Sequence, residues 1–390
     1  MARIIYVMHG PVLQNEYWSD MRIYINISAA IESGIWKESH FFQSIGYPWI
    51  ISMIRKFSGH YGEILTVFQT MASSLTLVFF YLMVRDGLGR KVALISLFIG
   101  ALHVPWIFFI TFALPEVLFT FLLSICGYLS VKIVHSKKHP LLFSLLWGTA
   151  FILAFWLKGT HALWGPLFLS GLLLLKRKAS IVPIILISTV VGGGLLAHGY
   201  LTHNLFGKIQ FGPSTGGLNF VEGKCPSKVN MDSEGFHWQS PLYYQLEKNA
   251  LKKWNKPFTH SGYFYKQGLK CIQNNPLVLL QSLESIPFLF YGNTIWPFNR
   301  KPLSDLSRLY ELFFTIFVIV GLVAFLFMSL SFQNLQNVVI WVFPVLAIFL
   351  CVYIFKSEMR YRIPYDLWFI PIAVKGWLDF AALRKVRIRP

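Results

Sequence analysis

The residues best suited to chemistry in this sequence are an aspartate at the start of a helical pattern and a cluster of cations near the C-terminus. After Asp20, the residues Tyr24, Ile27 and Ile31 recur at three- to four-residue spacing, which predicts a helix. A carboxylate in the first turn of a helix is favoured in its ionised form by the helix dipole. Asp20 is therefore a candidate general base, which would take a proton from a hydroxyl group.

The cations Lys356, Arg360 and Arg362 lie within one stretch of seven residues that follows an apolar run. Such a group suits a bound anion, and the forked guanidinium of arginine suits phosphate in particular. The alternative is that these side chains snorkel to lipid head groups.

Two further charged residues stand at the ends of apolar runs. Glu116 follows Leu114-Pro115, where helix capping is its ordinary role and substrate binding is the alternative. Lys158 lies between two apolar runs and could contact a substrate phosphate or carboxylate, or snorkel. The sequence has no H-E-x-x-H, C-x-x-C, P-loop or G-x-S-x-G motif, so it lacks the usual signatures of zinc hydrolysis, nucleotide hydrolysis and serine acyl transfer.

The composition is that of a membrane protein. Of the 390 residues, 55% are hydrophobic and only 13% are charged, which excludes a soluble globular domain of this size. We predict an all-α polytopic membrane protein with about nine to eleven transmembrane helices and a small mixed extracytoplasmic loop region. The predicted spans are residues 64–84, 92–112, 117–134, 141–157, 162–175, 181–201, 312–330, 338–355 and 367–383. Residues 277–291 are predicted to form a shorter interfacial helix.

Lysine and arginine are distributed unevenly between the loops. The formal net charge is +18, and basic residues collect near residues 85–91, 132–138 and 176–178 and in the C-terminal tail. By the positive-inside rule these segments would be cytoplasmic. The opposite, outward-facing side then carries Asp20, Glu116, Lys158, residues 202–276 and residues 356–362. The basic residues are scattered over short loops, so the charge does not indicate nucleic-acid binding.

Composition divides the chain into four parts. Residues 1–60 contain an acidic first outer loop and interfacial helices, and residues 61–205 form a transmembrane bundle. Residues 206–305 form an extracytoplasmic cap with an interfacial helix. Residues 306–390 contain the last spans, the outer arginine motif and a basic tail. Cys225 and Cys271 lie in the cap segment, where they would form a disulfide in an oxidising compartment or remain two free thiols.

Three motifs occur in order on the predicted outer side. The first comprises Ser19-Asp20, Tyr24 and Gly46-Tyr47-Pro48, the second is Leu114-Pro115-Glu116, and the third is EMRYRIPYD at residues 358–366. The stretch STGGLNF at residues 214–220 adds a Gly-Gly-Asn pattern that includes Gly217 and Asn219. Together these motifs resemble the GT-C superfamily of integral-membrane glycosyltransferases. The closer resemblance is to its bacterial branch related to protein mannosyltransferases and lipid A aminoarabinose transferases.

This resemblance implies an enzyme that transfers a hexosyl or pentosyl group, with inversion, from a polyprenyl-phosphate donor. The acceptor would be a hydroxyl of a glycolipid, a lipopolysaccharide or a protein, outside the bacterial inner membrane and facing the periplasm. Asp20 would be the base, and the donor phosphate would be bound by Arg360, Arg362, Lys356 and Lys158. The substrate would be bound by Tyr24, Tyr47, Glu116, Gly217 and Asn219. These cations make a cofactor dispensable, and the single Asp20, in place of the acidic pair of many relatives, gives little support to a divalent metal.

A polytopic transporter or flippase of lipid-linked substrates is the competing hypothesis. It predicts charges near the middle of spans and an internal repeat with broken helices in both halves. The sequence shows no such repeat, and its ionisable residues lie at the ends of the predicted spans. A non-catalytic scaffold is a second alternative, but it has no use for an aspartate and an arginine cluster on one face.

Overall fold

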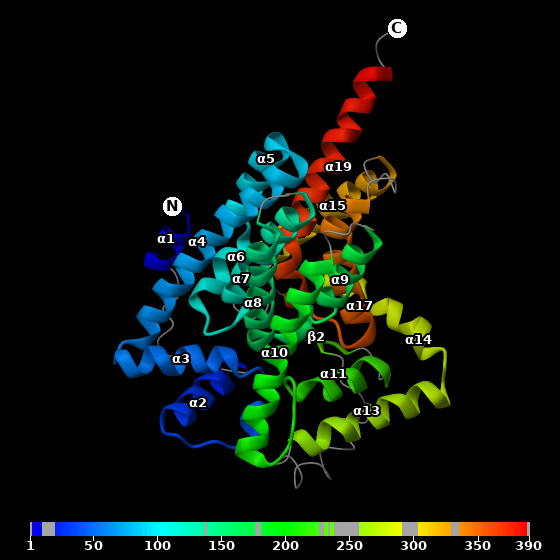
Figure 1. The fold of residues 1–390 in the computed structure, drawn as a ribbon. Coiled ribbons are helices and arrows are strands. Elements are labelled where there is room, and N and C mark those ends of the chain that lie inside the picture. The colour runs from blue at the N-terminus through cyan, green and yellow to red at the C-terminus, as the bar shows by residue number, and fades with distance from the viewer. Residues whose placement is uncertain are drawn as a thin grey trace.

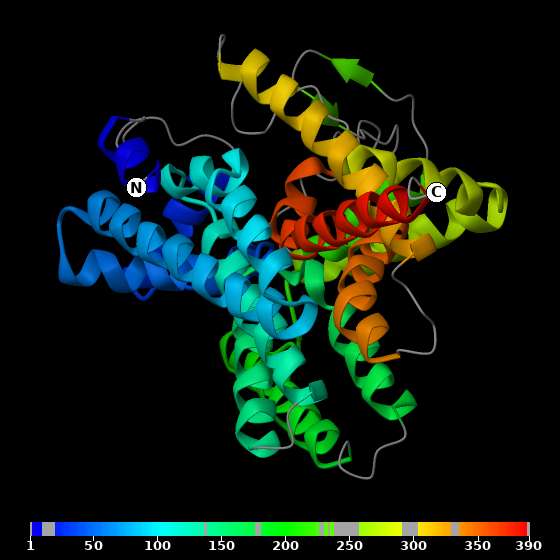
Figure 2. The same cartoon turned by 90° about the horizontal axis from the view of Figure 1, so that it is seen from above.

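The structure is a computed structural model that describes residues 2–9, 20–135, 139–175, 181–225, 230–232, 235–237, 257–290, 303–328 and 335–387. It is a helical bundle (Figures 1 and 2). Among the described residues, strands occur only as the short antiparallel pair β1 (Asn230–Asp232) and β2 (Gly235–His237). The predicted all-α membrane fold with a small mixed region is therefore confirmed.

Six helices in the described ranges are long and apolar enough to cross a membrane. They are α4 (Tyr61–Leu88), α7 (Glu116–His135), α8 (Pro140–Leu157), α10 (Ile181–Phe206), the Leu309–Met328 part of α15 (Leu303–Met328), and the continuous run of α16 (Leu335–Asn337), η7 (Val338–Val342) and α17 (Phe343–Ile354). Helix α5 (Arg90–Ala101) and the segment formed by α6 (Val104–Phe108) and η2 (Phe109–Thr111) are together long and apolar enough to cross a membrane. They are bent by 53° at the break between them, and they count as a seventh span if the bent pair crosses the membrane as one unit. Pro105 stands at this bend.

The described residues contain fewer helices that pass this length and apolarity test than the predicted nine to eleven, for two reasons. Helix α9 (Trp164–Leu174) has only 11 residues. At 1.5 Å per residue it covers roughly half of a hydrocarbon core about 30 Å thick. Helix α19 (Asp366–Arg387) has 22 residues but carries Asp366, Lys375 and Asp379, and its first half is buried inside the bundle.

Several short helices gather at one end of the bundle, at the bottom of Figure 1, while the end of α19 projects from the top. The helices at the lower end include α2 (Asp20–Glu32), η1 (Glu38–Phe41), α3 (Gly46–Phe57), η3 (Gly159–His161), α11 (Thr215–Lys224) and α13 (Pro257–Asn274). The other short helices are α1 (Ala2–His9), α14 (Val278–Gln281), η5 (Ser282–Ser285), η6 (Pro287–Leu289), α18 (Met359–Arg362) and η8 (Ile363–Tyr365). The leucines Leu277, Leu280 and Leu283 are exposed, as expected of the predicted interfacial helix.

Helices α11 and α13 form a cap that is joined to the rest of the lower end. Cys225 and Cys271 form a disulfide between them, with Cα atoms 5.4 Å apart. The backbone N–H groups of Ser214 and Thr215 donate to the carbonyls of Phe41 and Phe42, at 3.2 and 3.1 Å. The cap is thus held to the loop that follows α2.

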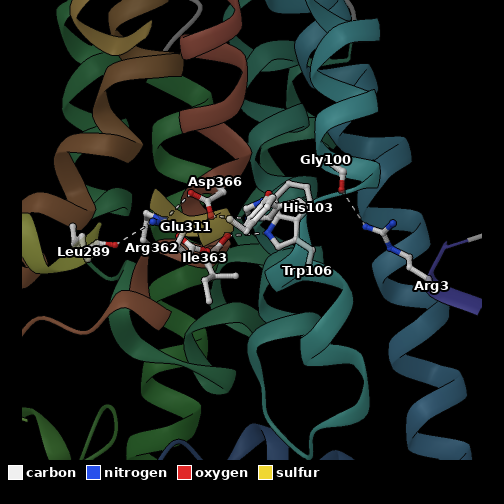
Figure 3. Close-up of polar contacts among 10 residues, drawn as sticks. Arg3, Gly100, His103, Trp106, Leu289, Glu311, Arg362, Ile363 and Asp366 are labelled. Carbon is white, nitrogen blue, oxygen red and sulfur yellow. Dashed lines mark hydrogen bonds and ion pairs between the residues drawn. The ribbon is translucent and has the colours of Figure 1, made fainter. Parts of the chain in front are cut away.

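The centre of the bundle contains a buried charge network (Figure 3). Arg362 of α18 has no exposed surface, and it pairs with Glu311 of α15 at 2.7 Å and with Asp366 of α19 at 3.1 Å. Asp366 also lies 2.9 Å from the imidazole of His103, which occupies the break between α5 and α6. One arginine therefore connects α18 to α15, to α19 and, through Asp366, to the bent span.

The backbone approaches most closely where α15 crosses α19. A Cβ atom added at Gly376 would lie 2.0 Å from the carbonyl oxygen of Gly321, and one added at Gly321 would lie 2.6 Å from the Cα atom of Ala373. Only glycine fits at either position. Glu311 of α15 and Asp366 of α19, the two helices that cross here, both lie within ion-pair distance of Arg362.

We expect Arg362→Met to destabilise the protein by about 3–5 kcal/mol, because it leaves two buried carboxylates without their cation. Thermal unfolding in detergent checks this. The matched control is Arg55→Met, which breaks the Glu32 ion pair at 2.9 Å with side chains 26% and 35% exposed. Such an exposed pair is worth about 1 kcal/mol or less. Equal losses in the two variants would contradict the assigned role of Arg362.

We expect the Cys225→Ser, Cys271→Ser double variant to lose about 2–4 kcal/mol of stability, as is usual when a native disulfide is removed. Limited proteolysis of the cap, with and without dithiothreitol, measures this loss. Reductant should accelerate cleavage of the unmodified protein and leave the double variant unchanged. If reductant has no effect on the unmodified protein, the two thiols are not bonded.

Candidate active site

A cavity of about 610 Å³ lies at the lower end of the bundle, between the membrane helices and the cap. Its walls come from α2, the start of α7, the junction of α8 and η3, residues 210–213, α11, α13 and the junction of α17 and α18. Among the described residues, the charged ones that line this cavity are Asp20, Glu116, Lys158 and Arg360. Four of the residues predicted from widely separated motifs therefore meet in one place.

Asp20 and Arg360 form an ion pair across the cavity. Asp20 is the first residue of α2, and its Oδ2 lies 2.7 Å from Nη1 of Arg360. Both side chains are mostly buried, at 17% and 18% exposure. Helix α2 is held in this position because Met21, Tyr24 and Ile27 are buried on its inner face. The carboxylate at the helix start is thereby fixed beside the guanidinium.

Arg360 also belongs to a chain of alternating charges that runs toward the cap. Its Nε lies 2.5 Å from Glu358, which lies 2.9 Å from Lys356, which in turn lies 3.1 Å from Glu222 of α11. Burial by itself would raise the pKa of Glu358, but the neighbouring Arg360 and Lys356 hold it well below its usual range. Glu358 therefore stays ionised and fixes both cations.

A second ion pair, between Glu116 and Lys158, borders the same cavity. The Lys158 Nζ lies 2.7 Å from Oε1 of Glu116, the first residue of α7, which is 2% exposed. The Oε2 of Glu116 is buried and has no hydrogen-bond partner among the described residues. The Tyr361 ring lies 5.0 Å from the Lys158 ammonium and 5.8 Å from the Arg360 guanidinium. Tyr361 therefore separates the two ion pairs.

The Gly-Gly-Asn segment forms part of the cap side of the cavity. Gly216 and Asn219 line it, whereas Gly217 lies against α13, where an added Cβ would come within 2.3 Å of the Ser261 carbonyl oxygen. An added Cβ at Gly216 would lie 2.7 Å from the Tyr265 hydroxyl. The two glycines thus allow α11 and α13 to approach, and Thr215 and Asn219 are the polar residues of α11 that line the cavity.

Three other predicted site residues do not line the cavity. Arg362 is in the central network described above, so the structure does not support its prediction as a phosphate ligand. Tyr47 is fully buried, with its ring 5.4 Å from that of Tyr24 and its hydroxyl donating to Gln69 at 3.0 Å. Lys356 holds Glu222 and Glu358 beside the cap. Tyr24 itself lines the cavity.

Several residues of the cavity wall, and Glu358 beside it, were not among the predicted site residues. Glu358 and Tyr361 belong to the third motif, and the alternation of cation and anion in Lys356-x-Glu358-x-Arg360 was the signal that could have identified Glu358. Tyr265 and Ser261 come from α13, and Gln43 and Ser44 from the loop after η1. No local pattern in the sequence indicated that these residues face the cavity.

The cavity places the carboxylate of Asp20, at the start of α2, near Arg360 and Lys158, which are cations able to bind an anion. Among the residues that the structure describes, no three His, Cys, Asp or Glu side chains are grouped so that they could hold a metal ion. The arrangement can therefore hold a phosphate beside a carboxylate that is able to accept a proton.

No protein-family model matches the chain, and no curated protein sequence matches it. Among solved structures it is similar to the archaeal oligosaccharyltransferase AglB from Archaeoglobus fulgidus in complex with an inhibitory peptide and a dolichol-phosphate. The TM-score is 0.54 at 12% sequence identity, over 99% of this chain and 50% of that one. The chain thus spans half the length of that protein and shares its fold, the GT-C membrane fold.

Proposed function

We propose that this protein is a membrane glycosyltransferase that moves a sugar from a polyprenyl-phosphate-linked donor to an acceptor hydroxyl. The observation that carries the proposal is the Asp20–Arg360 pair at 2.7 Å, in a cavity at one end of a GT-C fold. A base and an anion-binding cation are the two groups that such a transfer requires side by side.

In the proposed reaction, Asp20 accepts the proton of the acceptor hydroxyl while that oxygen attacks the anomeric carbon of the donor. The bond between the anomeric carbon and the phosphate oxygen breaks, its electron pair leaves with the polyprenyl phosphate, and the configuration at the anomeric carbon inverts. Arg360 stabilises the negative charge that develops on the leaving phosphate. Lys158 assists from the other side of Tyr361.

Arg360 links the binding of the donor phosphate to the acceptance of the proton by Asp20. Because its guanidinium contacts Asp20 at 2.7 Å, a phosphate that binds Arg360 competes with Asp20 for the same cation. When the phosphate displaces Asp20 from Arg360, the carboxylate oxygen of Asp20 becomes available to accept a hydrogen bond from the acceptor hydroxyl. We assign to Glu116, which lines the cavity, a hydrogen bond from a hydroxyl of the transferred sugar. We assign no metal ion to the step, since the cations supply the positive charge.

The proposed orientation places the cavity outside the cytoplasm. The Lys132–Asp86 contact at 2.7 Å brings the basic ends of α7 and α4 together, away from Glu116 at the start of α7. Basic loops favour the cytoplasmic side, and a disulfide in the cap favours an oxidising compartment. A bacterial inner membrane with a periplasmic active site fits both features, as does the bacterial branch of relatives that the sequence motifs resemble.

We expect Asp20→Asn and Arg360→Ala each to lower the transfer rate by about 10²–10³-fold, as is usual for a general base or a single electrostatic group. The measurement is transfer of radiolabelled mannose, glucose or arabinose from polyprenyl phosphate to material in membranes that contain the protein. The matched controls are Glu32→Gln on the same helix α2 and its partner Arg55→Ala, which break an ion pair outside the cavity.

The controls should retain transfer, and unfolding temperatures should show that all four variants fold. Full activity in Asp20→Asn would remove the proposed base. If no donor supports transfer, the transporter hypothesis becomes the better explanation of the cavity.

A further inference from the structure

The two walls of the cavity differ in charge. Among the described lining residues, the four charged ones, Asp20, Glu116, Lys158 and Arg360, all lie outside the cap. The described lining residues from the 210–213 loop, α11 and α13 are neutral. We call their six amide, hydroxyl and aromatic members the cap wall, which consists of Gln210, Phe211, Thr215, Asn219, Ser261 and Tyr265.

The neutrality of the cap wall does not follow from the composition of its helices. Helices α11 and α13 carry Glu222, Lys224, Lys266 and Lys270, but none of these lines the cavity. Glu222 pairs with Lys356, and the Lys224 ammonium is bonded to Ser282 at 2.7 Å. The cap therefore turns its neutral side chains toward the cavity and its charged ones elsewhere.

The cap wall is also the more open side. Tyr265 is 38% exposed and Phe211 is 49% exposed, whereas the side chains of Asp20 and Glu116 are 17% and 2% exposed. A molecule that arrives from water meets aromatic rings, hydroxyls and amides before it reaches the carboxylates. The cap wall is therefore the side from which a water-soluble acceptor group enters.

A neutral saccharide matches this wall best. Its hydroxyls both donate and accept hydrogen bonds, as do the amide and hydroxyl side chains of Asn219, Thr215 and Ser261. Its ring carries an apolar C–H face that packs on an aromatic ring such as that of Tyr265. An anionic acceptor would need a cation, and the described cap wall has none. A peptide that binds by adding a strand needs a free sheet edge, and the helices α11 and α13 offer none.

We propose that the acceptor is a neutral saccharide bound at the cap wall, so that the product contains a new bond between two sugars. This inference rests on the proposed glycosyl transfer. The acceptor hydroxyl reaches Asp20 and loses its proton there, and its oxygen forms the glycosidic bond as the polyprenyl phosphate leaves. Gly216 keeps the Tyr265 hydroxyl at this wall, since a Cβ in its place would lie 2.7 Å from it.

The first test identifies the atom to which the label is attached. Membranes that contain the full chain receive the radiolabelled donor, with Asp20→Asn membranes as background, and the labelled product is treated with protease, with alkali and by linkage analysis. We expect label joined glycosidically to a neutral sugar. Label on serine or threonine, or on a phosphorylated lipid head group, overturns this inference but leaves the proposed function standing. Label at background level overturns both.

The second test compares two tyrosines of α13. Tyr265→Leu should raise the KM for the labelled glycan about tenfold at saturating donor, the effect of losing one ring contact and one hydrogen bond. Tyr263→Leu on the same helix is the control, because Tyr263 is exposed and does not line the cavity. An unchanged KM in Tyr265→Leu, or an equal rise in both variants, overturns the assignment of the cap wall.

Discussion

The lower end of this molecule depends on the burial of one arginine. A guanidinium without solvent contact costs several kcal/mol unless carboxylates compensate it, and Arg362 has Glu311 and Asp366 at 2.7 and 3.1 Å. Because these partners come from α15 and α19, the short helix α18 can adopt only one position. That position directs Arg360, two residues earlier, toward Asp20. The catalytic proposal thus rests on a structural ion pair that itself takes no part in the chemistry.

The sequence supported the convergence of four residues, because Glu116, Lys158 and Arg360 stand at the ends of apolar runs and Asp20 lies in the acidic first outer loop. Counting the runs places all four on one side of the membrane, and the structure places them in one cavity. The same argument could not separate Arg360 from Arg362. Residues two apart on a helical turn point in different directions, and which one faces the core depends on α15 and α19, which are distant in sequence.

Other differences between prediction and structure have similar causes. Tyr47 was grouped with Tyr24 because both belong to one motif, yet it lies beneath Tyr24 and bonds to Gln69 of α4. Hydropathy alone counted α9 and α19 as full spans, whereas α9 is too short and the first half of α19 is enclosed by protein. Apart from Asn219, the cap wall was not predicted, because it is defined by which faces α11 and α13 present to the cavity. Periodicity describes a helix face but does not identify what that face meets.

The position of the central network in the chain also affects biogenesis. Membrane helices enter the bilayer in the order of synthesis, so α15 brings Glu311 into the membrane before Arg362 and Asp366 have been made. Until α18 follows, this carboxylate lacks the cation that pairs with it in the complete bundle, and an unpaired charged side chain is costly inside a membrane. Docking of α18 then neutralises Glu311 and delivers Arg360 to the cavity in the same event. A chain that stalls before α18 therefore lacks both the stabilising arginine and the proposed phosphate ligand.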